Sequence, residues 1–132
     1  MQRRAKQLGS WVAVVDDDAS VRTALARLLR SAELPVKTFA SAREFLAEYA
    51  DHPPDCLVLD VHLGEMSGLE LYDYLASYAP VMPVIFITAH DEVLASELTR
   101  RAGPHGYLRK PFDGDALLAL VRRAMLHAED GR

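Results

Sequence analysis

The sequence is poor in cysteine and has no long apolar run. Its single cysteine, Cys56, excludes a disulfide within the chain, and its position in the run CLVL predicts a small buried side chain. The apolar run at residues 11–15, which follows a basic N-terminus, is too short for a signal-peptide core or a membrane span. We therefore expect a soluble, unprocessed protein of a reducing cytoplasm, with no membrane partner.

The chain also lacks an excess of positive charge. Its 15 lysines and arginines are outnumbered by 19 aspartates and glutamates, which gives a net charge of −4. No overall positive field is present to attract nucleic acid, so we expect no direct nucleic-acid binding by this domain. A length of 132 residues, half of them apolar, suits one domain with one core. We place that domain at residues 10–128, with loose termini at 1–9 and 129–132.

Short apolar runs alternate with segments of helical periodicity along the chain. The runs have the length and the β-branched or aromatic content of strands, and they are residues 11–15, 36–39, 56–59, 84–87 and 106–108. Apolar residues at helical spacing follow each run, within residues 21–29, 45–49, 69–75, 93–98 and 117–125. This alternation with short connections predicts parallel strands joined by right-handed crossovers, and hence a doubly wound α/β sandwich.

Two of the predicted helices begin with the motif S-x-x-E. The motif pairs Ser41 with Glu44 and Ser67 with Glu70. It is typical of a capping box, in which each side chain accepts a hydrogen bond from a backbone N–H that the helix leaves unpaired. We expect a capping box at both helix starts.

Polar side chains follow four of the five predicted strands. Three aspartates, Asp16 to Asp18, follow the first strand, and Asp60, Thr88 and Lys110 follow the third, fourth and fifth. The carboxyl ends of parallel strands form one edge of the sheet, where functional residues gather. Clustered carboxylates repel by roughly 4 kcal/mol for a pair about 4 Å apart, so they need a cation. All-oxygen ligands favour Mg²⁺, and an aspartate beside Mg²⁺ and a lysine is a suitable acceptor for a phosphoryl group.

Each of these residues also has a simpler interpretation. Asp17 and Asp18 could cap the first helix, and Asp60 could cap a loop. Thr88 could be a turn hydroxyl, and Lys110 could lie in a solvated turn. Their joint occurrence at separate strand ends favours one shared site.

Four segments resemble the receiver domains of bacterial two-component response regulators. They are VVDDD (14–18), LVLDVHLGEMSGLEL (57–71), IFITAH (85–90) and YLRKPF (107–112), and they occur in the family's order over nearly the whole chain. The resemblance implies the flavodoxin-like, five-stranded (βα)5 fold with strand order 2-1-3-4-5. The run SGLEL and the triplet TAH are most similar to the branch of nitrogen-fixation regulators that carry a C-terminal helix-turn-helix domain.

The resemblance implies a metal-assisted phosphorylation site. Asp60 would accept the phosphoryl group, Asp17 would bind Mg²⁺ directly, and Asp16 would act on the ion largely through water. The backbone carbonyl of His62 would be a further ligand. Asp18 has no such role in the family, so we expect it to cap the first helix.

The resemblance also implies a switch. Thr88 and Lys110 would contact the phosphoryl group, and Tyr107 would change rotamer as Thr88 moves. The phosphodonor would be a phosphohistidine on a sensor histidine kinase, and the signal would leave through the fourth helix, fifth strand and fifth helix. The partners would be a DNA-binding output domain or an effector protein, with homodimerisation on phosphorylation. The domain would be no enzyme beyond its own phosphorylation and slow dephosphorylation.

Three departures from the usual receiver pattern concern the loops of this site. Gly64 stands four residues after the acceptor, where many receivers have proline, and glycine permits more backbone freedom. His62 and His90 stand two residues after the acceptor and the threonine, at positions whose side chains flank the attacking water in the family and tune dephosphorylation. They could equally be ordinary exposed loop histidines. Gly103 and Pro104 would stiffen the turn before the fifth strand.

Two other functions remain open. A haloacid-dehalogenase-like phosphatase would also form an aspartyl-phosphate, but such enzymes usually carry a second acid two residues after the nucleophile, where this chain has His62. A pseudo-receiver would keep the fold and bind partners without phosphorylation.

Overall fold

The sheet has the strand order that the resemblance implies. The computed structural model describes residues 10–77, 82–89, 100 and 106–130, and within them five parallel strands lie in the order β2-β1-β3-β4-β5. Each strand agrees with its predicted range to within one residue at either end. The strands are β1 (Val12–Val15), β2 (Val36–Phe39), β3 (Cys56–Asp60), β4 (Val84–Thr88) and β5 (Tyr107–Arg109).

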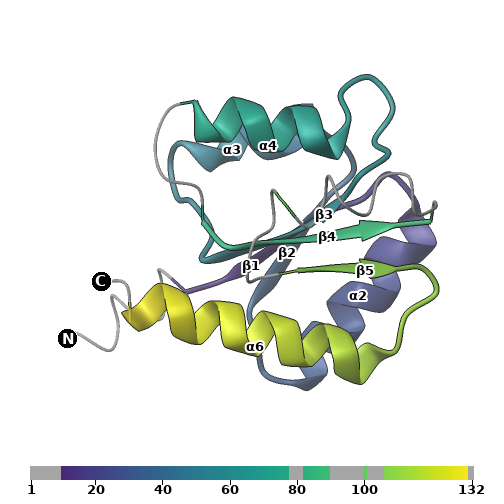
Figure 1. Cartoon of the computed structure of the whole chain (residues 1–132), viewed down its shortest axis with the longest axis vertical. Helices are drawn as coiled ribbons and strands as arrows, with labels where there is room; N and C mark the ends of the chain where they lie inside the picture. Colours follow the sequence, from purple (N-terminus) through teal and green to yellow (C-terminus); the bar gives the residue numbers. More distant parts are fainter. Residues whose placement is uncertain (1–9, 78–81, 90–99, 101–105, 131–132) are drawn as a thin grey trace.

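Helices cover both faces of this sheet. Figure 1 shows α3 and α4 on one face and α2 and α6 on the other. The predicted helix within residues 93–98 and the turn at 103–104 lie outside the described residues. No helix in the part of the chain that the structure describes is long and apolar enough to cross a membrane. The described helices are α2 (Ala19–Ser31), α3 (Ala42–Tyr49), α4 (Gly68–Ala76) and α6 (Gly114–Asp130).

The core consists of two layers, one on each face of the sheet. Alternate strand residues such as Leu59 and Phe86 pack with α3 and α4, whereas Val58 and Ile87 pack with α2 and α6. Both kinds of position are buried, which explains the continuous apolar runs. Cys56 is buried as predicted, and this burial raises the pKa of its thiol to about 12.

The two predicted capping boxes differ in the structure. Ser67 and Glu70 form the complete reciprocal box at the start of α4. At the start of α3 the Ser41 hydroxyl accepts from the Glu44 N–H at 3.1 Å, but the Glu44 carboxylate accepts from the N–H of Ala40 at 2.9 Å. The prediction of a capping box at Ser41 is therefore only half correct. Ser41 has the more extended backbone, with φ of −153° against −75° for Ser67. At Ser41, the N–H of the preceding residue, Ala40, therefore donates to the carboxylate of Glu44.

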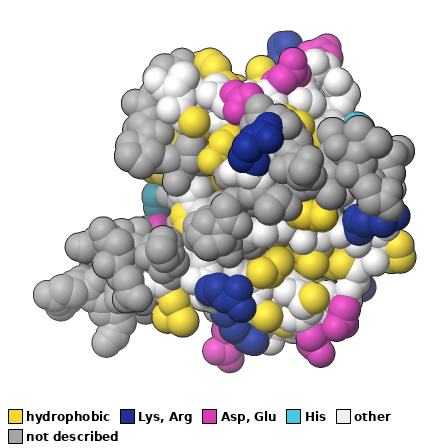
Figure 2. All heavy atoms as spheres, viewed as in Figure 1, with side chains coloured by type: hydrophobic (Ala, Val, Ile, Leu, Met, Phe, Trp, Pro, Cys, Tyr) yellow, Lys and Arg dark blue, Asp and Glu magenta, His cyan; other side chains and the backbone are white. Residues whose placement is uncertain are grey.

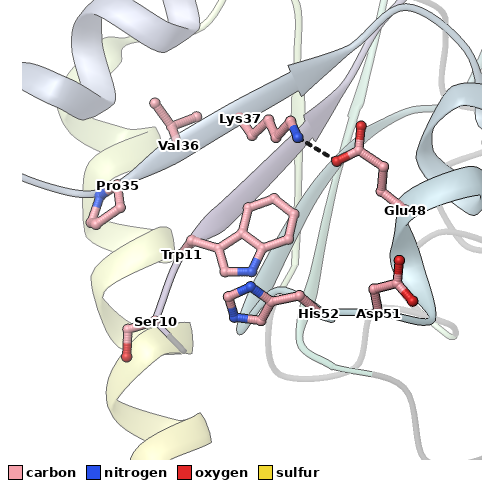
Figure 3. Close-up of a pocket in the computed structure, with 8 residues that line it drawn as sticks. All are labelled: Ser10, Trp11, Pro35, Val36, Lys37, Glu48, Asp51 and His52. Atoms are coloured by element: carbon pink, nitrogen blue, oxygen red, sulfur yellow. Dashed lines mark hydrogen bonds and ion pairs between the residues drawn. The ribbon is translucent and has the colours of Figure 1, made fainter. Parts of the chain in front are cut away.

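The opposite edge of the sheet, where the strands begin, carries a hollow of about 390 Å³ that the sequence did not predict. Trp11 stands in it with its ring 5.8 Å from that of His52 and 6.3 Å from that of Phe39 (Figure 3). Lys37 and Glu48 form an ion pair at its rim. The indole Nε1 of Trp11 is buried and has no hydrogen-bond partner among the described residues.

Gly68, the first residue of α4, packs directly on the backbone that ends β3. Its N–H donates to the carbonyl of Val61 at 2.8 Å. A Cβ at this position would lie only 2.3 Å from the carbonyl oxygen of Asp60, so a residue larger than glycine cannot fit without backbone movement. Gly64, in the loop between them, has open space around it but a φ of +89°. Proline, whose φ is fixed near −65°, could not adopt that backbone.

We predict that Gly68→Ala is the more costly of two matched substitutions in this loop. Gly68→Ala forces two backbone segments apart and should lower the free energy of unfolding by more than about 2 kcal/mol. Gly64→Ala meets no atom and should cost about 1 kcal/mol, the strain of a left-handed alanine. Urea denaturation of both variants measures the difference, and equal costs would contradict the close packing at Gly68.

Candidate functional site

Three carboxylates converge where β1 and β3 end. The strands are neighbours with Val15 opposite Leu59, so Asp16, the residue that follows β1, lies beside Asp60, the last residue of β3. With Asp17 they form a group in which one carboxylate oxygen from each residue lies within 4.8 Å of the others. Asp16 and Asp60 are buried, at 0% and 4% exposure, whereas Asp17 is exposed. The predicted acidic cluster therefore exists, with two of its members in the interior.

Lys110, which follows the outer strand β5, brings a positive charge to these acids. Its Nζ lies 3.0 Å from Oδ2 of Asp16 and 3.6 Å from Oδ2 of Asp60. Its backbone N–H donates to the carbonyl of Thr88 at 2.7 Å, which ties the end of β5 to the end of β4. Burial opposes the charge of Lys110, but the hydrogen bond to Asp16 and the charge of Asp60 outweigh it and raise the pKa of the amine. The solvated-turn interpretation of Lys110 is therefore wrong, and its shorter contact is with Asp16.

The pKa of Asp60 changes because of this arrangement. Burial, reinforced by the charge of Asp16, raises the pKa of Asp60 to about 6. Two contacts favour the charged form: the ammonium of Lys110, and the N–H of His62, which donates to Oδ1 of Asp60 at 3.3 Å. A further cation at the three carboxylates would stabilise the ionised acid.

The donor set suits a hard divalent cation. All three side chains offer carboxylate oxygens, two buried and one open to solvent. A site with few protein oxygens that leaves room for water is typical of Mg²⁺, and less so of Ca²⁺, which takes six to eight oxygen ligands. The acidic cluster can therefore hold a metal ion.

Thr88 and Tyr107 lie on the same face of the sheet. Tyr107 stands opposite Phe86, and Thr88 follows two residues later on that strand, so their side chains share one face. Thr88 is buried at 1% exposure, and Tyr107 is half-buried against the layer of α3 and α4. His62 is exposed in the loop after β3, and His90 lies outside the described residues.

Two further residues place Asp16, and the sequence did not identify one of them. Arg22, on α2, donates from Nη1 to the carbonyl of Asp16 at 2.8 Å. The N–H of Asp18 donates to Oδ1 of Asp16 at 2.9 Å, while the Asp18 carboxylate caps α2 by accepting from Ser20 and Val21. The predicted cap is thus confirmed. An arginine six residues after an aspartate has no distinctive pattern, so Arg22 needed the structure to find it.

The sheet order and the acidic cluster at its carboxyl edge define a signalling domain of the receiver type. Residues 12–122 match the family model of the response regulator receiver domain, and the chain belongs to that family of two-component signalling proteins.

Individual relatives agree with this family. The chain is 41% identical over 117 residues to the DNA-binding transcriptional regulator NtrC of Salmonella typhimurium, across 89% of this chain and 25% of NtrC. It is 35% identical over 130 residues to response regulator protein TodT of Pseudomonas putida F1, across 98% of this chain and 57% of TodT. A CheY-like receiver domain protein of Methanospirillum hungatei has a TM-score of 0.83 at 25% identity, covering 95% of this chain and 99% of that one.

The match to NtrC agrees with the nitrogen-regulator-like branch expected from the sequence. The chain spans about a quarter of the length of the NtrC relatives and about half that of TodT.

We predict that the Asp60 carboxylate makes the metal-free protein less stable as pH rises from about 4 to about 6. The unfolded chain releases this proton near its ordinary pKa of about 4, before the folded chain does, so folding loses stability across that window. Above it, Asp60→Asn should be more stable than wild type by on the order of 1 kcal/mol, allowing for solvent screening. Urea denaturation in a chelating buffer measures this difference.

The matched control is Asp18→Asn. Hydrogen bonds from Ser20 and Val21 lower the pKa of Asp18, so its carboxylate should have the opposite pH trend. Added Mg²⁺ should stabilise the wild type more than Asp60→Asn. If the difference in free energy of unfolding between wild type and Asp60→Asn stayed constant from pH 4 to 7, the pKa of Asp60 would not be raised in the folded protein.

Proposed function

We propose that the chain is a phosphorylation-activated receiver that takes a phosphoryl group onto Asp60 from a sensor histidine kinase, with Mg²⁺ as cofactor. The observation that supports this most is the grouping of Asp60 with Asp16, Asp17 and the Lys110 ammonium at the end of β3. Such a grouping supplies a nucleophilic carboxylate and the positive charge that a phosphoryl group requires.

The transfer would use the ionised form of Asp60. A carboxylate oxygen attacks the phosphorus of the phosphohistidine, a P–O bond forms as the P–N bond breaks, and the leaving imidazole takes up a proton from solvent. Lys110, 3.6 Å from Asp60, neutralises part of the charge on the phosphoryl oxygens. Held by Asp16, Asp17 and Asp60, with the His62 carbonyl as a further ligand, Mg²⁺ would supply the remaining charge neutralisation.

Phosphorylation would change the end of β4. A new phosphoryl oxygen beside Asp60 can accept a hydrogen bond from Thr88, and Tyr107 on the same face would then change rotamer. One hydrogen bond to a charged group is worth roughly 1.5–3 kcal/mol, whereas moving a two-state equilibrium from 1:99 to 99:1 takes about 5.5 kcal/mol. Thr88 would therefore need the contribution of Lys110 and the loops.

The signal would pass to β5, α6 and the predicted helix at 93–98, which lies outside the described residues. Its receiver would be a DNA-binding output domain, an effector protein or a second copy of the chain.

We expect acetyl phosphate with Mg²⁺ to add one phosphoryl group to the wild-type protein. Intact-mass measurement should show the gain in wild type and in Asp18→Asn, because the Asp18 side chain caps α2 and the substitution leaves its backbone N–H, which contacts Asp16, in place. The gain should be absent in Asp60→Asn. An equal gain in Asp60→Asn would exclude Asp60 as the acceptor, and no gain in wild type would favour a pseudo-receiver.

We propose that His62 and His90 set the lifetime of the phosphoryl group, because the resemblance assigns their positions to the flanks of the attacking water. Imidazole side chains there would alter access and polarity around that water. We expect the dephosphorylation rate of isolated phosphoprotein to change in His62→Ala with His90→Ala. His52→Ala, at the opposite edge of the sheet, is the control and should keep the wild-type rate. An unchanged rate in the double variant would reject the idea.

A further inference from the structure

A groove of about 590 Å³ runs along α2 on the side of the strand β2. Every charged residue that lines it is an arginine, although the chain as a whole has a net charge of −4. Figure 2 shows that lysine and arginine side chains, in dark blue, and acidic side chains, in magenta, both occur on the face of the molecule seen there. The groove is lined by Ala19, Arg22, Thr23, Ala26, Arg27, Arg30, Ser31 and Thr38.

The arginines of this groove are not all used within the fold. Arg22 donates to the Asp16 carbonyl, but Arg27 and Arg30 are exposed and have no ion pair with any residue that the structure describes. The lining residues Ala19 and Ala26 are small, which leaves space for an extended chain to approach α2. Guanidinium groups at such a rim are suited to carboxylates, which they bind in a bidentate manner.

The strand beside this groove has an open edge. β2 is one of the two outermost strands, and the carbonyls of Pro35 and Phe39 accept hydrogen bonds from the N–H groups of Val12 and Asp16 at 2.8 and 3.1 Å. Because backbone groups alternate along a strand, those of Val36 and Thr38 point away from β1. No strand among the described residues pairs with them on that side. An extended segment could therefore pair with β2 while Thr38 and the arginines line its path.

We propose that this groove binds an extended acidic segment of a partner protein, which adds as a strand to the free edge of β2. Side chains of an added strand alternate, so acidic residues at every second position would point toward α2 and meet Arg27 and Arg30. This groove is distinct from the site at Asp60, the residue that we propose to be phosphorylated, and Arg22 lies next to both because it donates to the Asp16 carbonyl.

Two other occupants fit the groove less well. Nucleic acid would need stacking surfaces, and no aromatic side chain lines it, while the net charge of −4 repels a polyanion. A second copy paired through β2 would add three more arginines beside this groove, whose lining contains no acid to offset their charge.

The test uses fluorescence anisotropy with a peptide of about eight residues that alternates glutamate and threonine and carries a neutral dye. Wild type should bind it more weakly as salt is raised. The double variant Arg27→Glu with Arg30→Glu should bind at least about tenfold more weakly. Arg122→Glu with Arg123→Glu, two exposed arginines of α6, is the matched control and should bind as wild type does. Thermal unfolding by circular dichroism checks that both double variants are folded.

A second probe tests the strand pairing itself. The same peptide with alternate backbone nitrogens methylated cannot pair with β2 and should lose its affinity. The proposal is overturned if wild type does not bind the first peptide, if both double variants bind it equally, or if methylation has no effect. Tighter binding of a single-stranded oligonucleotide, or a dimer that only the Arg27→Glu, Arg30→Glu variant loses, would also overturn it.

Discussion

The carboxyl edge of this sheet depends on the repulsion between two buried carboxylates, Asp16 and Asp60. Parallel pairing of β1 with β3 forces them together, and burial deprives them of water. Lys110 offsets part of the cost, and the carbonyl and N–H contacts around Asp16 hold the arrangement in place. A fold that only needed stability would use apolar residues there. The repulsion that remains favours the binding of a cation at this edge.

Much of the fold could be predicted because each signal was local. Strands covered on both faces need continuous apolar residues, so runs such as CLVL marked β3 to within one residue. The box at Ser41 was only half correct because its partner depends on the backbone angle of the cap, which the motif S-x-x-E does not specify. The strand order came from the resemblance, since no local pattern states which strands are neighbours.

The candidate site could likewise be predicted only in part. The acids, Thr88 and Lys110 were found because each lies at the end of a strand or just after it, and the carboxyl ends of parallel strands meet at one edge. The contact of Arg22 with a backbone carbonyl could not be predicted, because it depends on how α2 is rotated against β1. The open edge of β2 beside three arginines likewise became visible only when helix and strand were placed together.

The glycine at the start of α4 has a mechanical consequence. Most helices rest on a sheet through side chains, which can change rotamer and absorb small shifts. At Gly68 the peptide of the helix rests on the peptide of Asp60 itself, without a side chain between them. A displacement of the Asp60 backbone would therefore move the start of α4 directly, because no side chain lies between them to absorb it.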